Sequence, residues 1–180
     1  MVRIFVVLVV VALEFGAFYI KPPEQTVTAV VEIKERHLPR DNSLAGVLAE
    51  HKDDIKNASM LYKVDPKIIT GILMVESRGN PNAVSPTGAK GCMQTMTSAD
   101  IDTGTHDLDS FNCPVSIIKG TKYIALLRDR YGFADPFEAV VAYSDGPIQT
   151  KGYTEKQLQN NVYLEKVRRV MRKIPPRTFS

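Results

Sequence analysis

Two Asp–Pro pairs, at positions 65–66 and 135–136, constrain the fold of this chain more than any other feature. An aspartate can cap the first turn of a helix, and a proline fits the first helical position, where no amide donor is needed. Apolar residues follow each pair, and the first run stops at Asn80-Pro81. The two pairs therefore predict helices over residues 66–77 and 136–143.

Apolar residues also recur at three- and four-residue spacing in other parts of the chain. They predict further helices over 44–61, 92–99, 114–131 and 162–171, with Gly132 ending the third. Thr154 and Gln157 have the spacing of a capping box. With 180 residues, 44% of them hydrophobic, the chain is long enough for one domain with a real core. We expect a nearly all-α domain at 44–174, a linker at 21–43 with a short strand at 26–31, and a tail at 175–180.

Residues 2–20 are almost wholly apolar, interrupted only by Arg3 and Glu14. Spanning a membrane takes about 20 such residues, although a carboxylate at mid-membrane is costly. A signal peptide has a basic start and a small-x-small cleavage site, and here the start is Arg3 alone, with no clean Ala-x-Ala before Lys21. We expect residues 1–20 to direct export, either as a cleaved signal peptide or as an uncleaved membrane anchor.

Glu76 stands at the end of the first Asp–Pro helix, directly after the apolar run 71–75. A carboxyl group held against apolar neighbours keeps its proton to higher pH, and the negative end of the helix dipole favours the same form. Such a group can act as a general acid near neutrality. By itself, a glutamate at this place is more often the first polar residue after a buried face. The segments that follow decide between the two interpretations.

Those segments carry a resemblance to a known family. Glu76-Ser77 is followed by a turn-rich loop that closes on Gly91-Cys92-Met93-Gln94, and later by Ala142-Tyr143-Ser144-Asp145-Gly146-Pro147 and Tyr163-Leu164-Glu165-Lys166-Val167. In this order, over roughly residues 45–172, the chain resembles the soluble lytic transglycosylases, relatives of goose-type lysozyme. The resemblance implies a mostly α, lysozyme-like domain that acts on peptidoglycan.

The resemblance also implies that one glutamate works alone. Glu76 would protonate the glycosidic oxygen between N-acetylmuramic acid and N-acetylglucosamine, and then take a proton from the muramic C6 hydroxyl as a 1,6-anhydro ring closes. The sugar's acetamido group would stabilise the positive charge, with no metal or other cofactor. Most glycosidases instead use two carboxylates. Asp109 and Asp145 are the candidates for a second one, and neither has apolar sequence neighbours that would raise its pKa.

Further roles follow from the resemblance. Ser77 would form a hydrogen bond near the glutamate, Met93 and Gln94 would line the groove with Gln94 donating to the glycan, and Tyr143 and Tyr163 would orient Glu76 or contact sugar. Without the resemblance, a helix-end serine, a core methionine and half-buried tyrosines are the ordinary interpretations. The substrate-binding set that we expect is Ser77, Met93, Gln94, Tyr143, Ser144 and Tyr163.

The chain departs from the family pattern at three positions. Cys92 replaces an apolar residue, Ser144 an asparagine, and Asp145 an alanine. The new charge at Asp145 would change the fit of the substrate or position a water molecule. Three activities therefore stay open: lytic transglycosylation, hydrolysis of the same bond as in a muramidase, and glycan binding or an assembly role with weak catalysis.

The remaining charged and sulfur-bearing residues suggest few other partners. Cys92 and Cys113 would form either a disulfide, as an exported protein permits, or two buried free thiols. The three histidines are scattered without metal-ligand spacing, and a net charge of +3 demands no nucleic acid. The basic tail is either a solvated helix face or a contact for acidic lipid or wall polymer; it consists of Arg168, Arg169, Arg172, Lys173 and Arg177.

The expected setting follows from the export segment and the resemblance. Peptidoglycan would be the main partner, with the membrane as a second partner if residues 2–20 stay uncleaved. We expect the protein in the periplasm or at the outer face of the inner membrane, with a phage virion as the alternative. A short chain without a recognisable binding module fits local opening of the wall, for a secretion, conjugation or phage-entry machine, better than bulk wall turnover.

Overall fold

The structure is a computed structural model, and it describes residues 40–180. The helices of this part are α1 (Leu44–Tyr62), α2 (Pro66–Glu76), α3 (Thr97–Thr103), α4 (Cys113–Asp129), α5 (Pro136–Asp145), α6 (Pro147–Lys151), α7 (Glu155–Gln159) and α8 (Val162–Met171). The prediction of a mostly α chain is confirmed here, since the only β-structure between 40 and 180 is two isolated bridges. The predicted export segment, the linker up to residue 39 and the strand at 26–31 lie outside the described residues. No helix within the described part is both long and apolar enough to cross a membrane.

Both Asp–Pro pairs start helices as predicted. The Asp65 carboxylate accepts a hydrogen bond from the backbone of Lys67, and the Asp135 carboxylate accepts one from Phe137, each at 2.8 Å. The capping box at Thr154 is present as well, with hydrogen bonds in both directions to Gln157. Local capping chemistry therefore sets where these helices begin.

The helix predicted over 92–99 is wrong in position. Residues 91–94 form turns, and α3 begins only at Thr97. Two antiparallel bridges, Val84 with Lys90 and Lys90 with Thr95, hold this stretch as a folded loop. Gln94 has φ of 50°, which a right-handed helix cannot contain. The loop's own pairing therefore overrides the helical tendency of its apolar residues.

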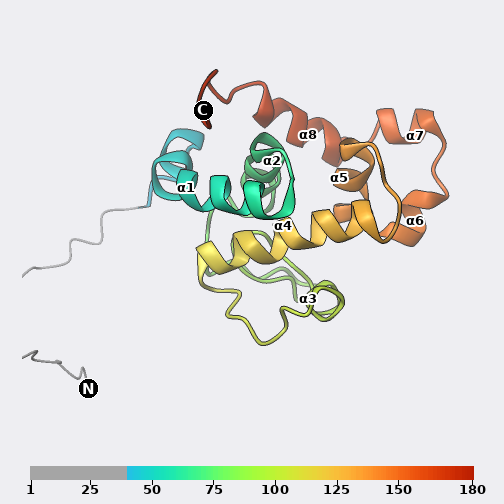
Figure 1. Cartoon of the computed structure of the whole chain (residues 1–180), viewed down its shortest axis with the longest axis horizontal. Coiled ribbons are helices and arrows are strands. Elements are labelled where there is room, and N and C mark those ends of the chain that lie inside the picture. Colours follow the sequence, from blue (N-terminus) through green and yellow to red (C-terminus); the bar gives the residue numbers. More distant parts are fainter. Residues whose placement is uncertain (1–39) are drawn as a thin grey trace, which may run out of the picture. The chain divides into compact units, whose positions relative to one another are not determined.

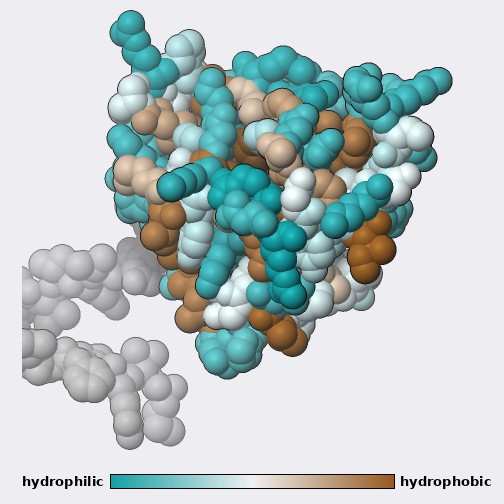
Figure 2. All heavy atoms as spheres, turned by 45° about the vertical axis from the view of Figure 1, so that its right-hand side comes forward, coloured by the Kyte–Doolittle hydropathy of each residue, from teal (hydrophilic) through white to brown (hydrophobic). Residues whose placement is uncertain are grey.

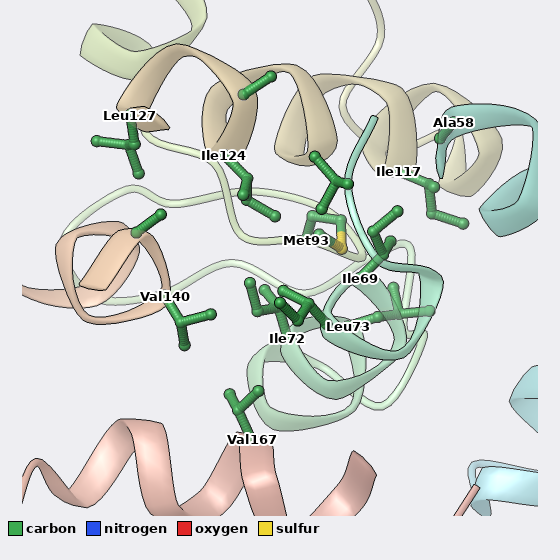
Figure 3. Packing of buried hydrophobic residues seen from close by; sticks show 14 of the residues in the cluster. Ala58, Ile69, Ile72, Leu73, Met93, Ile117, Ile124, Leu127, Val140 and Val167 are labelled. Atoms are coloured by element: carbon green, nitrogen blue, oxygen red, sulfur yellow. The ribbon is translucent and has the colours of Figure 1, made fainter. Parts of the chain in front are cut away.

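Helix α2 lies at the centre of the packing, between α8 and α4 in the view of Figure 1. Its residues Ile69, Ile72 and Leu73 are fully buried, and Figure 3 shows side chains of α4, α5 and α8 converging on them around Met93. Gly71 lets α8 approach closely, because a Cβ there would lie 2.7 Å from Val167 Cγ1. This close approach brings the start of α8 beside the end of α2. The side turned forward in Figure 2 is mainly hydrophilic, with hydrophobic residues in small separate groups.

The loop before α3 and the segment after it are tied to α4 by buried polar and covalent contacts. Cys92 and Cys113 form a disulfide, with Cα atoms 5.4 Å apart. Lys119 of α4 is 1% exposed, and its ammonium lies 2.8 Å from an Asp100 carboxylate oxygen and 2.6 Å from Ser110 Oγ. Removing one partner of a buried ion pair strongly destabilises a fold, because the other charge is left buried and uncompensated. These contacts fix the 91–112 segment against the core.

Candidate active site

Glu76 is the last residue of α2 and is half-buried where the helix meets α8. Burial raises the pKa of its carboxyl group above the ordinary value for glutamate, and a hydrogen bond from Tyr163 partly opposes that rise. The negative end of the α2 dipole favours the protonated form in the same way as burial does. The direction predicted from the apolar run is therefore found, with burial as its leading cause.

Tyr163 is the direct partner of this carboxyl group. Its hydroxyl donates to Glu76 Oε1 at 2.5 Å. Burial, followed by the nearby charge of Glu76, raises the pKa of Tyr163 well above the ordinary value for a phenol. The phenol therefore keeps its proton and remains a donor to the carboxylate. Tyr163 stands in the first turn of α8, which Asn161 caps by accepting from the backbone of Leu164 at 3.0 Å.

Tyr143 lies near the same carboxyl group but is bonded elsewhere. Its hydroxyl donates to the backbone oxygen of Met93 at 2.7 Å, and its ring packs against Tyr123 with centroids 5.5 Å apart. Burial, and then the charge of Glu76, raises the pKa of Tyr143 well above the ordinary value for a phenol. Helix α4 can come this close because a Cβ at Gly120 would lie 2.7 to 2.8 Å from Met93 side-chain atoms and the Tyr143 hydroxyl. Of the two tyrosines expected to orient Glu76, only Tyr163 forms a hydrogen bond with it.

Ser77 joins the end of α2 to the loop that follows. Its hydroxyl donates to the Cys92 backbone oxygen at 2.6 Å and accepts from the Asn80 backbone at 3.0 Å. The hydrogen bond expected near the glutamate is thus made to the loop rather than to the carboxyl group. Its effect is to hold the end of α2 in place.

Two of the expected groove residues need correction. Met93 has 0% exposure, so it is a core residue and does not line an open groove, as Figure 3 shows. The Gln94 side-chain amide donates to the backbone oxygens of Ala83 and Gly91, both at 2.9 Å. Both amide hydrogens are therefore engaged in closing the loop, and Gln94 is not free to donate to a glycan. Only its side-chain oxygen remains to meet a ligand.

Four of the expected residues border two neighbouring hollows: Gln94, Tyr143, Ser144 and Tyr163. We name the first the Tyr163 hollow; its lining includes Ser144, Asp145, Tyr153, Asn161, Tyr163 and Lys166. We name the second the Tyr143 hollow; its lining includes Gln94, Tyr123, Tyr143, Ser144, Asp145 and Gly146. Ser144 and Asp145 belong to both, so the end of α5 separates the two hollows. Glu76 adjoins the first hollow through its hydrogen bond to Tyr163.

Asp145 is held in place by residues that the sequence did not single out. One of its carboxylate oxygens accepts from the Tyr153 hydroxyl and from the Asn161 side-chain amide, both at 3.0 Å. Asn161 was recognisable as a residue directly before a predicted helix, but its contact with the end of α5 had no local signal. Tyr153, Tyr123 and Lys166 were missed for the same reason.

Asp109, the other candidate for a second carboxylate, lies away from Glu76 and the two hollows. Asp109 is exposed after α3, accepts a hydrogen bond from the Phe111 backbone at 2.9 Å, and lines neither hollow. Within residues 40–180, no group of three or more His, Cys, Asp or Glu side chains is placed to hold a metal ion. The arrangement therefore offers a half-buried carboxyl group that can give up a proton beside an open hollow and afterwards take one back.

Comparison with known proteins adds the following. The family model for the transglycosylase SLT domain matches residues 53–164, more than half of the chain. A transglycosylase of Enterobacteria phage PRD1 is 32% identical over 114 residues, which are 60% of this chain and 42% of the phage protein. Membrane-bound lytic murein transglycosylase C of Histophilus somni (strain 2336) is 30% identical over 143 residues, 68% of this chain and 39% of that protein. The endo-type membrane-bound lytic murein transglycosylase A of Salmonella paratyphi B is 33% identical over 108 residues, 51% of this chain and 52% of that protein. This chain thus spans about half the length of these relatives or less.

Proposed function

The chain belongs to the transglycosylase SLT family, and on that premise we propose that it is a peptidoglycan lytic transglycosylase. Its reaction would cleave the β-1,4 bond between N-acetylmuramic acid and N-acetylglucosamine and leave 1,6-anhydromuramic acid ends. The observation that carries the proposal is the Glu76 carboxyl group, whose pKa burial raises and which Tyr163 holds at 2.5 Å. The names of the relatives from Histophilus and Salmonella support the same activity.

The reaction needs one carboxyl group in two roles. Protonated Glu76 gives its proton to the glycosidic oxygen while the bond from that oxygen to the anomeric carbon breaks. The positive charge that develops on the muramic sugar is stabilised by its own acetamido oxygen. The Glu76 carboxylate then takes the proton of the C6 hydroxyl, whose oxygen bonds to the anomeric carbon and closes the anhydro ring. No water is consumed, and Glu76 ends in the form in which it began.

Neighbouring groups would hold the substrate and the intermediate carboxylate. The Tyr163 hydroxyl stabilises the carboxylate after proton transfer, since a hydrogen bond to a charged group is worth about 1.5–3 kcal/mol. Ser144, Tyr143 and the Gln94 side-chain oxygen line the hollows where sugar hydroxyl and acetamido groups would lie. Ser77 and Met93 would not touch the substrate. Ser77 fixes the end of α2 through its hydrogen bond to the Cys92 backbone oxygen, and the Met93 backbone oxygen accepts a hydrogen bond from the Tyr143 hydroxyl.

Hydrolysis of the same bond is the second candidate, and Asp145 is the observation that favours it. Its carboxylate lines both hollows, and two donors hold it still. In that reaction Asp145 would position a water molecule whose oxygen bonds to the anomeric carbon while the Glu76 carboxylate takes its proton, leaving a reducing end. A protein that binds glycan with weak catalysis is the third candidate, because Ser144 and Asp145 depart from the family pattern.

Mass spectrometry of sugars released from purified peptidoglycan distinguishes these candidates. We expect anhydro products from the wild-type protein and none from Glu76→Gln, which cannot donate the proton but still binds the wall. Reducing ends would replace the first proposal with hydrolysis. If the wild-type protein binds the wall and releases nothing, the glycan-binding candidate takes the place of both.

We also propose where the protein acts and how its chain is divided. We propose that residues 1–20 direct export, that 21–43 form a linker and that 44–174 form the catalytic domain. The protein would then act in the periplasm or at the outer face of the inner membrane, opening the wall locally for a secretion, conjugation or phage-entry machine. Relatives named as membrane-bound, and one from a phage, support this range. Cell fractionation with N-terminal sequencing tests it: loss of residues 1–20 indicates a signal peptide, and their retention in the membrane fraction an anchor.

A further inference from the structure

A third hollow is lined by the end of α2, by α8 and by the start of α1, and it is rimmed by four cations. Its lining includes Arg78, Lys166, Arg169 and Lys173 around an apolar floor of Met74, Val75 and Val170. We call it the cationic cleft. Met74 and Val75 directly precede Glu76 in α2, and Lys166 also lines the Tyr163 hollow. The cleft therefore adjoins the Tyr163 hollow, with Lys166 bordering both.

The lining of this cleft carries four cations and no acidic residue within the described part of the chain. None of its four cations forms an ion pair with a carboxylate among residues 40–180. Glu165 pairs with Arg172 at 2.8 Å, which lowers the pKa of its carboxyl group, and the charge of Arg169 lowers that pKa further. Asp41 accepts from the Ser43 backbone at 2.9 Å. The first turn of α1 forms another wall, and the positive end of a helix dipole adds to the attraction for anions.

The geometry points to the peptide stem of peptidoglycan as the occupant, and we propose that the cationic cleft binds its carboxylates. This inference rests on the proposed function, because it takes peptidoglycan as the substrate. The stem hangs from the same muramic sugar whose glycosidic bond Glu76 would cleave, so it starts on the ring next to the acid. Its alanine methyl groups suit the apolar floor, and its free carboxylates suit the lysine and arginine rim.

The dimensions agree with this occupant. Lys166, Arg169, Val170 and Lys173 follow one another at the spacing of a single helix face. Arg169 comes six positions after Tyr163 within α8, which corresponds to about 9 Å along the helix, and Lys173 follows just past the end of α8. A stem of about four residues reaches roughly 13 Å when extended. A stem that starts at the Tyr163 hollow therefore reaches most of the rim. An anionic membrane surface would also attract these cations, but it would not explain why the cleft is recessed and adjoins the Tyr163 hollow.

The test compares peptidoglycan strands of matched length, with stems and with the stems removed by an amidase. Binding is measured with the full-length Glu76→Gln protein, so that no cleavage disturbs the equilibrium. We expect tighter binding to the stem-bearing strands. Neutralising two cations, as Arg169→Gln with Lys173→Gln, should raise the Kd for stem-bearing strands about three- to tenfold, because each exposed ion pair accounts for up to about a fivefold change. The ratio of the two Kd values should fall accordingly.

A matched control removes the same charge elsewhere. Lys52→Gln with Lys67→Gln changes two exposed lysines that line none of the three hollows described here. This control should leave the Kd ratio unchanged. Equal Kd values for both kinds of strand, or a ratio that Arg169→Gln with Lys173→Gln does not move, would overturn the inference. If that pair instead weakens binding to phosphatidylglycerol vesicles alone, the cleft is a membrane contact and the stem proposal fails.

Failure of the proposed function gives a different result. A wild-type protein that releases no anhydro product from either strand contradicts the lytic reaction. The Kd ratio is still measured in that case, because it depends on binding alone.

Discussion

Removing the Tyr163 hydroxyl should move the pH range over which Glu76 acts as an acid. The general acid must be protonated, so activity falls as the pH rises through the pKa of Glu76. The Tyr163 hydrogen bond lowers that pKa against the effect of burial, because it stabilises the carboxylate. Tyr163→Phe therefore raises the pKa of Glu76, and the alkaline limb of the activity profile shifts to higher pH.

The size of this shift follows from the hydrogen bond. A bond to a charged group is worth about 1.5–3 kcal/mol, and partial exposure of Glu76 reduces this to about 1–2 kcal/mol. Since about 1.4 kcal/mol corresponds to a tenfold change in an equilibrium, the midpoint of the limb should rise by about one pH unit. Maximal activity should fall about tenfold as well, because the carboxyl group loses the contact that orients it.

The assay is the initial rate of anhydro-muropeptide release from purified peptidoglycan, measured across the alkaline limb. Tyr143→Phe is the matched control, because its hydroxyl donates to the Met93 backbone and not to Glu76. It should leave the midpoint in place even if the rate falls. A midpoint that stays fixed or moves to lower pH in Tyr163→Phe would refute the assignment of Tyr163 as the group that stabilises the carboxylate.

Three further perturbations test how the site is built. Gly120→Ala places a Cβ within 2.8 Å of core and site atoms, so it should lower the free energy of unfolding by about 1–3 kcal/mol in urea titration; Gly152→Ala, whose Cβ meets nothing closer than 3.4 Å, should not. Replacing Cys92 and Cys113 by serine opens a loop with a sequence separation of 21 and should cost about 3 kcal/mol in the chain-entropy model; an unchanged urea midpoint would contradict this. Asp145→Ala should still release anhydro products, as measured by mass spectrometry. If the wild-type protein instead released reducing ends and Asp145→Ala abolished them, Asp145 would direct a hydrolytic water.

Local sequence signals predicted most of the helices because their chemistry is local. A capping aspartate needs only the amide two positions later, as at Asp65 and Asp135, and the capping box at Thr154 needs only Gln157. The helix expected over 92–99 was wrong because its residues pair with the preceding loop. That pairing joins residues whose meeting depends on how the whole loop folds.

The candidate site was predictable in composition but not in its bonds. Tyr163 and Tyr143 were expected to play similar parts, and packing separates them: one donates to Glu76 and the other to a backbone oxygen. Met93 was expected at the groove and is buried, since the close approach of α4 at Gly120 covers it. Nothing in the sequence linked Asp145 to its donors, which belong to later segments of the chain.

Capping and apolar spacing act over a few residues, so the amino-acid sequence was enough to predict a mostly helical domain and a glutamate at the end of an apolar helix. It also determined the direction of the pKa of Glu76, since both burial and the helix end raise it. The side chains that surround that carboxyl group, and the four cations that border the cationic cleft, became known only from the folded arrangement of the helices. These neighbours depend on how closely helices that are far apart in the sequence pack against one another. The distance between two helices is set by the side-chain volumes where they touch, as at Gly71, and the sequence does not say which positions will touch.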